Sequence, residues 1–304
     1  MISRIKAYLY NKYNKYLIDK RLKSFQKERK CIKSIVVIYY IPKSNVEKYN
    51  NWEDGFTKAV DLLSEDFEIT RINLEDQKPT ADQLNKFDLI IAKSCWNWIV
   101  DDYINSLEGI KSLKGIAVSC SLAPKYKSDV WKYDIIWYET EDYVGEVKQH
   151  PRKYQAFGVN TDKFYPQNLE KSIDVLSIGM LEPYKRFEKL NNIEGEVKLI
   201  IGNKNNKNSE SVLTKLNSNI KVIDYVPQEE LAKYINSSKV VYIPASSNGG
   251  GERAILEAKA CDVPVIVEKD NLKLTKLLSS DKDYTIKGYY NSLHNSINLL
   301  NSKS

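Results

Sequence analysis

The chain has 304 residues, 42% of them hydrophobic and 11% aromatic, which is enough apolar material for one large domain or two ordinary ones. Twelve Gly and nine Pro exclude a collagen-like or low-complexity architecture, and only two His disfavour a histidine-rich metal centre. With 46 Lys and Arg against 40 Asp and Glu, the formal net charge is +6.

This charge is concentrated at one end of the chain. Residues 1–33 hold eleven Lys and Arg against two acidic side chains, a net charge of +9. The remaining 271 residues carry 35 basic and 38 acidic side chains, a net charge of −3. The sequence therefore predicts a slightly acidic body with a basic N-terminal arm, and the overall charge does not indicate the partners of the body.

The cysteine content and the hydropathy pattern predict a cytoplasmic protein. Four Cys lie far apart and form no CxxC pair, which is typical of reduced proteins. No apolar run approaches the roughly 20 residues that a membrane-spanning helix needs. Lys and Asn interrupt the N-terminal segment every few residues, so it lacks the apolar centre of a signal peptide.

The basic arm, residues 1–33, is predicted to be an amphipathic helix. Aliphatic and Tyr side chains recur at steps of three and four residues: Ile2, Ile5, Leu9, Tyr13, Tyr16 and Leu17. Two interpretations stay open: the helix lies on an anionic membrane surface, or it packs on the body with a solvated basic face. Nucleic-acid binding is not expected, because nothing else in the chain resembles a nucleic-acid-binding module.

Short β-branched and aromatic runs alternate with helical patterns in the next part of the chain. A helix is expected over residues 54–63. The predicted strands cover residues 34–41, 67–74, 88–92, 115–119 and 133–138. This alternation predicts a mostly parallel sheet covered on both faces, in an N-terminal Rossmann-like domain over residues 34–155.

The same alternation restarts after a less regular stretch, residues 156–172, which is interpreted as a linker. Strands are predicted over residues 173–178, 197–201, 220–225, 240–243 and 263–267. Helices are predicted over residues 227–237, from Glu252 through Glu257, and over 290–301. The pattern predicts a second Rossmann-like domain over residues 173–304, whose last helix is a candidate to return to the N-terminal domain.

The segment Pro244–Val267, PASSNGGGERAILEAKACDVPVIV, has the strongest pattern of a binding site. A buried strand ends in a loop with three glycines, Gly249 to Gly251, which permit positive φ and let a ligand approach the backbone. A helix then begins near Glu252, and its free N–H groups favour a phosphate or a sugar oxygen. Glu257, in mid-helix, is able to accept hydrogen bonds from paired hydroxyls. The alternative is a simple tight turn with two surface glutamates.

A second candidate segment is SIGMLEPYKRFEKL, residues 177–190. Here a strand and Gly179 are followed by Lys185 and Arg186, which are predicted to lie at a helix start. Arg and Lys both suit a diphosphate, as a fork and as a point charge. The alternative is an ordinary basic first turn, which the helix dipole disfavours slightly.

Four segments in order resemble glycosyltransferases of the GT-B fold, in particular the retaining family 4, which includes the bacterial group 1 transferases. They are YDIIWYETEDYVGEV, FGVNTDKFYP, IDYVPQEELAKYINSSKVVYIP and PASSNGGGERAILEAKACDVPVIV. The resemblance is good over residues 133–267 and weak over 34–132. It implies a retaining hexosyltransferase that moves a sugar from a nucleotide sugar to a saccharide or lipid-linked acceptor, in surface polysaccharide or glycolipid synthesis.

The resemblance also implies roles for single residues. Lys185 matches the Lys that holds the donor diphosphate, and Glu257 matches the Glu that holds the nucleotide ribose. The first family glutamate falls on Gly249, so Glu252 is the nearest replacement and, with Lys185, the predicted catalytic pair. The family Arg falls on Met180, for which Arg186 is the candidate substitute. The other donor-binding residues that it implies are Gly179, Tyr225, Val226, Gly249, Gly250, Gly251, Arg253 and Ala254.

The N-terminal domain is expected to hold the acceptor. Trp rings stack well on sugar rings, and the candidates on this side are Trp52, Gly55, Trp96, Asn97 and Trp98. The alternative is that the tryptophans pack at a domain boundary. No metal or other cofactor is expected, because Lys side chains, a helix dipole and backbone amides are able to neutralise a departing diphosphate.

A second function stays open at this point. The missing first glutamate, Met180 at the Arg position and the short N-terminal domain also fit a non-catalytic relative. Such a protein binds a nucleotide or a glycan and acts as a partner subunit.

Overall fold

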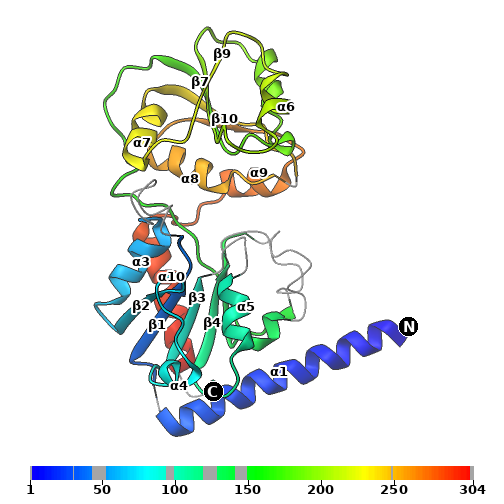
Figure 1. The fold of residues 1–304 in the computed structure, drawn as a ribbon, viewed down its shortest axis with the longest axis vertical. Coiled ribbons are helices and arrows are strands. Elements are labelled where there is room, and N and C mark those ends of the chain that lie inside the picture. Colours follow the sequence, from blue (N-terminus) through cyan, green and yellow to red (C-terminus); the bar gives the residue numbers. More distant parts are fainter. Residues whose placement is uncertain are drawn as a thin grey trace. The chain divides into compact units, whose positions relative to one another are not determined.

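The computed structural model describes residues 2–29, 31–42, 53–93, 99–118, 129–140, 149–247 and 249–301. The chain divides into two units, each with its own sheet (Figure 1). The first unit contains residues 1–48, 56–157 and 287–304. The second contains residues 49–55 and 158–286, so the last helix belongs almost wholly to the first unit.

The first unit is built on a six-stranded parallel sheet with the order β2-β1-β3-β4-β5-β6. Its strands are β1 Ser34–Tyr39, β2 Glu68–Asn73, β3 Leu89–Lys93, β4 Leu113–Val118, β5 Ile135–Tyr138 and β6 Lys153–Gln155. The central strands β3 and β5 are buried at every position, as their continuous apolar sequences require, whereas the edge strand β2 is mostly exposed or half-buried.

Helices cover both faces of this sheet. The helical segments are α1 Ile2–Arg29, α3 Gly55–Leu63, α4 Ala81–Leu84, α5 Ile99–Ser106, the 3₁₀ turn η2 Asp129–Lys132 and α10 Ile286–Asn301. One apolar cluster joins α3 and α10 to the sheet, and a second joins α5 and η2 to it. Helical segments thus bury both faces, which is the arrangement that parallel strands need.

Among the described side chains of helix α1, those that anchor it in the apolar clusters lie in its second half. Ile18 belongs to one of the two apolar clusters, and Leu22 and Phe25 belong to the other. The packed interpretation of the arm is therefore right for this half. The predicted stripe is not a packing face: of the stripe residues with described side chains, Ile5, Leu9, Tyr13 and Tyr16 are between 53% and 61% exposed.

The second unit has a five-stranded parallel sheet with the order β11-β10-β7-β8-β9. Its strands are β7 Ile173–Ile178, β8 Lys198–Ile201, β9 Ile220–Ile223, β10 Ser238–Ile243 and β11 Val265–Val267. The helices are α6 Ser209–Leu213, α7 Gln228–Asn236, α8 Glu252–Ala260 and α9 Leu272–Leu278, with 3₁₀ turns η5 Pro183–Lys185 and η6 Phe187–Asn192. All ten strands predicted from the sequence are present, and β6 is an additional one.

Within the described ranges, no helix is both long enough and apolar enough to cross a membrane. Helix α1 has the necessary length, but its mean hydropathy is far too low because Lys and Arg recur along it.

Candidate functional site

The order of strands in the second sheet marks the place where a ligand is expected. The chain runs from β7 outward to β8 and β9 and then returns to β10 on the other side of β7. In open parallel sheets, ligands bind at the carboxyl ends of the strands, at the point where the order reverses. The segments that follow β7 and β10, residues 179–186 and 244–251, flank this point.

The segment after β7 is shaped around the side chain of Lys185. Gly179 has φ of +151°, and a Cβ at this position would lie 3.3 Å from Cε of Lys185. The predicted helix start at Lys185 and Arg186 is only partly right: Lys185 ends the short turn η5, and Arg186, with a left-handed φ of 53°, is the N-cap of the next 3₁₀ turn, η6. Pro183 fixes the first φ of the turn, and Arg186 then stops it from continuing as a helix.

Arg186 links the two segments that flank the switch point. Its guanidinium binds both carboxylate oxygens of Asp270, at 2.6 and 2.8 Å. It also donates to the carbonyl oxygens of Pro244 and Ala245, at 2.8 and 3.0 Å. All three guanidinium nitrogens thus have acceptors within the protein, and the diphosphate contact predicted for Arg186 stays a prediction.

Gly249 and Gly251, in the loop after β10, serve close packing, and neither has the left-handed φ that the run of glycines permits. A Cβ on Gly249 would lie 2.8 Å from Cβ of Ala245, and one on Gly251 would lie 2.5 Å from Cγ2 of Ile243. The φ of Gly251 is 161°, which is extended backbone. The backbone is therefore closely packed at these two positions, with no room for side chains.

Three charged side chains, those of Lys185, Glu252 and Lys273, meet where this loop enters α8, and we call this cluster the charged corner. The ammonium of Lys185 donates to the carbonyl oxygen of Gly250 at 2.5 Å. Glu252, the first residue of α8, pairs with Lys273 at 2.5 Å, and its other oxygen accepts from the N–H of Gly251 at 2.9 Å. Lys185, Glu252 and Lys273 are each less than 10% exposed. Burial lowers the pKa of Lys185 to about 8; Glu252 opposes this shift and Lys273 adds to it.

This cluster is suited to a divalent anion. Two ammonium groups face one carboxylate, so the cluster carries a surplus positive charge at the N-terminus of a nine-residue helix. Unpaired N–H groups and the helix dipole favour negative charge there as well. The carboxylate of Glu252 is already held by Lys273 and by a backbone amide. A direct contact of Glu252 with a donor sugar stays a prediction.

Lys273 and Asn271 are parts of this corner that the sequence analysis missed. Asn271 caps α9 and donates to the carbonyl oxygens of Ser246 and Ala245, at 2.7 and 3.1 Å. An Asn directly before the apolar run LKLTKLL is a recognisable N-cap signal. Nothing in the local sequence indicates that Lys273, 21 residues after Glu252, turns inward.

Glu257 is a buried carboxyl group in the middle of α8. It is 5% exposed, and no described residue donates a hydrogen bond to its carboxylate. Burial raises its pKa to about 7, and Arg253, one turn earlier, opposes the shift. Buried polar groups in proteins are usually hydrogen-bonded. An unsatisfied carboxylate one helical turn from the charged corner is therefore a natural acceptor for ligand hydroxyls.

The remaining candidates on the donor side take different positions. Tyr225 and Val226 follow β9 and are half-buried at the carboxyl edge of the same sheet. In α8, Ala254 is buried, whereas Arg253 is exposed. The structure thus brings Gly179, Lys185, Gly250 and Glu252 together.

Four of the five acceptor-side candidates, Trp52, Trp96, Asn97 and Trp98, lie outside the described residues. The fifth, Gly55, begins α3, and a Cβ there would lie 2.2 Å from the carbonyl oxygen of Gly158. Packing alone thus accounts for this glycine. In the part of the chain that the structure describes, no three His, Cys, Asp or Glu side chains are grouped as metal ligands. Metal independence stays a prediction.

The second unit and the charged corner lie mostly within the part of the chain that matches a known family model. Residues 160–300, which include the whole charged corner, match the family model described as "Glycosyl transferases group 1". The comparison with curated proteins gives no match.

Solved structures are similar to almost the whole chain. Anabaena Alr3699/HepE, solved with UDP and glucose, is 11% identical over 88% of this chain and 89% of its own, with a TM-score of 0.55. Sucrose-phosphate synthase from Thermosynechococcus elongatus is 13% identical over 89% and 92%, with a TM-score of 0.58. AviGT4, a glycosyltransferase involved in avilamycin A biosynthesis, is 12% identical over 87% and 88%, with a TM-score of 0.59. The chain has the GT-B fold, as its sequence predicts.

Proposed function

We propose that the protein is a glycosyltransferase that uses a nucleotide sugar as its donor. The match of residues 160–300 to the group 1 transferases and the GT-B fold support this function. The observation that carries it is the buried corner of Lys185, Lys273 and Glu252 at the switch point of the second sheet. The transferred sugar is a hexose, the acceptor is a saccharide or a lipid-linked saccharide, and the anomeric configuration is retained. The product belongs to a surface polysaccharide or a glycolipid.

In this proposal the second unit stabilises the departing nucleoside diphosphate. Its charge grows in the transition state, so a fixed ammonium and fixed amides lower the barrier more than they stabilise the bound donor. Lys185 and the N-terminal amides of α8 take this role, and Glu252 holds Lys273 in place beside them. Glu257 binds the ribose hydroxyls. No metal ion is needed for this neutralisation.

A panel of nucleotide sugars tests the proposal directly. Calorimetric titration of the full chain is expected to find one donor that binds with micromolar affinity, and an assay for released nucleotide then measures turnover. Failure of every nucleotide sugar to bind would show that the protein has no donor site. If a donor binds but no acceptor of a panel of saccharides and lipid-linked saccharides gives turnover, the protein is a non-catalytic partner subunit and not an enzyme.

We also propose that the first half of α1 lies on the cytoplasmic face of an anionic membrane. Exposed Tyr and aliphatic side chains alternate there with Lys, the composition of helices that bind in the interface plane: Ile5, Tyr8, Leu9, Tyr10, Tyr13 and Tyr16 are each 48–64% exposed. This location brings the enzyme to a lipid-linked acceptor.

Sedimentation with vesicles tests this location. Removal of residues 1–33 is a poor test, because it takes Ile18, Leu22 and Phe25 out of the apolar clusters. Substitution of Tyr8 and Leu9 by Ser in the full chain leaves the packed half intact. The double variant is expected to lose at least about tenfold in binding to anionic vesicles, since each large apolar side chain contributes ~1.5 kcal/mol or more on burial. Equal sedimentation of the variant and the wild type would show that the arm does not insert.

A further inference from the structure

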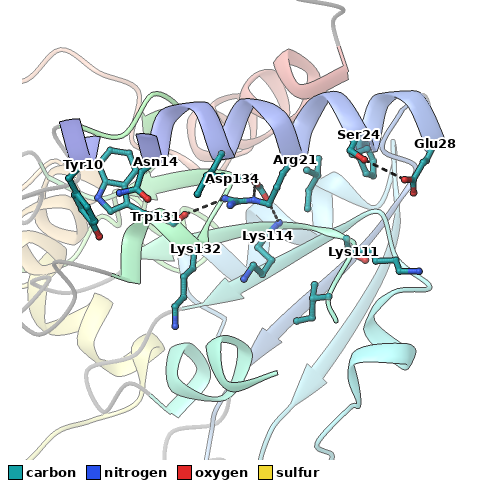
Figure 2. A pocket seen from close by; sticks show the side chains of 15 residues that line it. Tyr10, Asn14, Arg21, Ser24, Glu28, Lys111, Lys114, Trp131, Lys132 and Asp134 are labelled. Carbon is teal, nitrogen blue, oxygen red and sulfur yellow. Dashed lines mark hydrogen bonds and ion pairs between the residues drawn. The ribbon is translucent and has the colours of Figure 1, made fainter. Parts of the chain in front are cut away.

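A pocket of about 580 Å³ lies in the first unit beneath α1, and no residue of the proposed donor site lines it (Figure 2). Its walls are α1, the segment 110–114 that leads into β4, and the segment 131–134 that leads into β5. Both segments enter the sheet at the amino ends of their strands. Ligands of parallel sheets usually bind at the carboxyl ends of the strands. The pocket lies at the opposite edge of the sheet. We call it the α1 pocket.

Positive charge dominates the lining of the α1 pocket. Its four cationic side chains are those of Arg21, Lys111, Lys114 and Lys132, and its two acidic ones are those of Glu28 and Asp134. Figure 2 shows Arg21 reaching from α1 to Asp134, with which it pairs at 2.8 Å. Asp134 also accepts the backbone N–H of Lys114 at 2.9 Å, so its two oxygens are both engaged.

Lys114 places a half-buried ammonium in this pocket without a direct acceptor. No described residue accepts a hydrogen bond from its Nζ or forms an ion pair with it, and the centroid of the Tyr133 ring is 6.0 Å away. Burial lowers the pKa of Lys114 to about 8, and the charge of Asp134 opposes the shift. Holding an ammonium group in such a place is unfavourable unless an anion joins it.

Two further donors in the lining are buried and unsatisfied. Among the described residues, the indole Nε1 of Trp131 and the amide Nδ2 of Asn14 have no hydrogen-bond partner, and Trp131 is only 5% exposed. The Trp131 ring is held in place by the ring of His150, whose centroid is 5.6 Å away. Leaving a buried donor unpaired costs about 1–3 kcal/mol. The pocket thus offers an ammonium and two N–H groups to a ligand that supplies only acceptors.

We propose that the α1 pocket binds a phosphate group, either of a phospholipid headgroup or of a soluble phosphate ester. A phosphate has several strong acceptor oxygens, which match the unpaired donors of Lys114, Trp131 and Asn14. The volume has room for an ester group beyond the phosphate itself. The pocket opens beneath the helix whose first half is exposed and aromatic, so a lipid headgroup fits the surroundings best. This inference stands independently of the proposed transferase activity.

Binding of defined phosphate probes to the full chain tests the proposal. The soluble probes are inorganic phosphate and glycerol 3-phosphate, measured by calorimetry. The lipid probes are vesicles of phosphatidylcholine with and without phosphatidic acid, measured by sedimentation. Binding of the soluble probes alone assigns the pocket to a phosphate ester, and binding of phosphatidic acid vesicles alone assigns it to a lipid headgroup.

Two variants connect the binding to the pocket. Lys114→Met and Trp131→Phe are each expected to weaken binding of the effective probe at least tenfold. Lys23→Met, which removes the same charge from an exposed position of α1 outside the pocket, is expected to change it less than threefold. Thermal unfolding shows that each variant is folded, and donor binding is expected to stay unchanged in all three. Wild-type affinity in Lys114→Met, or no binding of any probe, would overturn the proposal.

Discussion

Lys185→Met is expected to lower kcat/KM for donor turnover at least about 100-fold, the range found when one preorganised donor is removed from a site of developing charge. Lys185 is a buried cation whose ammonium donates, among the described residues, to the carbonyl oxygen of Gly250 alone, so it is available to a second acceptor. Met keeps the length and apolar character of the side chain, and the space that Gly179 leaves for Lys185 stays filled.

The protonation of Lys185 gives this prediction a second measurement. The pKa of Lys185 in the free protein is about 8, because the side chain is buried and Lys273 lies nearby. A bound diphosphate favours the charged form and raises this pKa. At pH 8.5 the donor is therefore expected to bind with uptake of a fraction of a proton. Calorimetry in two buffers of different ionisation enthalpy measures that uptake, which is expected to vanish in Lys185→Met.

Lys239→Met is the matched control for Lys185. Lys239 lies near the amino end of β10, is 61% exposed and pairs with Asp174, far along the strand from the charged corner. It is expected to retain turnover within a factor of two. Turnover of Lys185→Met within threefold of the wild type would exclude Lys185 from the site and leave the neutralisation to Lys273 and the amides of α8.

The sequence predicts the fold well because the strands are buried on both faces. Continuous β-branched runs such as SIVVIY and IDVLSI have few alternatives to a central parallel strand. Strand β6 is not predicted from the sequence, because its three residues, KYQ, are half-buried and carry no apolar run. The short helices α4 and α6, of four and five residues, are equally weak in periodicity and are held by tertiary contacts.

The charged corner could be predicted only in part from the sequence. The order of strand, glycine and Lys marks Lys185, and the start of α8 at Glu252 follows from the loop before it. The salt bridge from Lys273 to Glu252 has no signal, because a buried Lys looks like an exposed one in a polar stretch such as EKDNLKLTKLL. The conformation of Arg186 was also unpredictable, since a left-handed Arg depends on its contacts with Asp270 and two carbonyls.

Helix α1 shows a different limit of sequence patterns. A stripe at helical spacing from Ile2 to Leu17 predicts an apolar face, yet the side chains that pack are Ile18, Leu22 and Phe25 further along. Periodicity identifies a face but not the partner that covers it. The partner of the second half is the sheet of the first unit, and the proposed partner of the first half is a membrane.

Glu257→Gln is expected to weaken donor binding about 10- to 100-fold and, at pH 8, to stabilise the protein. The loss follows because hydrogen bonds to a charged acceptor contribute ~1.5–3 kcal/mol each, and the neutral amide accepts ribose hydroxyls less strongly. The gain follows because Glu257 is buried and has no donor among the described residues. Its charge is therefore unfavourable in the ligand-free protein.

The pH dependence of stability identifies this effect. The carboxyl pKa is 4.5 in its unperturbed state and about 7 in the folded protein. Between these values the folded state holds a proton that the unfolded state has lost, so the free energy of unfolding falls as the pH rises. Above pH 7 the full cost is about 3 kcal/mol, from ~1.4 kcal/mol for each pKa unit. Burial also lowers the pKa of His150 to about 4, which destabilises the folded state at pH 5 in wild type and variant alike. The stability of Glu257→Gln relative to wild type is therefore expected to rise by about 2.5 kcal/mol from pH 5 to pH 8.

Glu230→Gln, an exposed change in the first turn of α7, is the control for both measurements and is expected to leave the pH dependence of stability and the donor affinity unchanged. Destabilisation of Glu257→Gln at pH 8 would contradict the prediction, because it would mean that the carboxylate stabilises the ligand-free fold. A variant that is more stable and binds the donor less well would instead show that Glu257 is kept for the ligand. Functional sites commonly contain residues that improve binding and lower stability. Substitution of a residue that serves packing alone does not raise stability and weaken binding together.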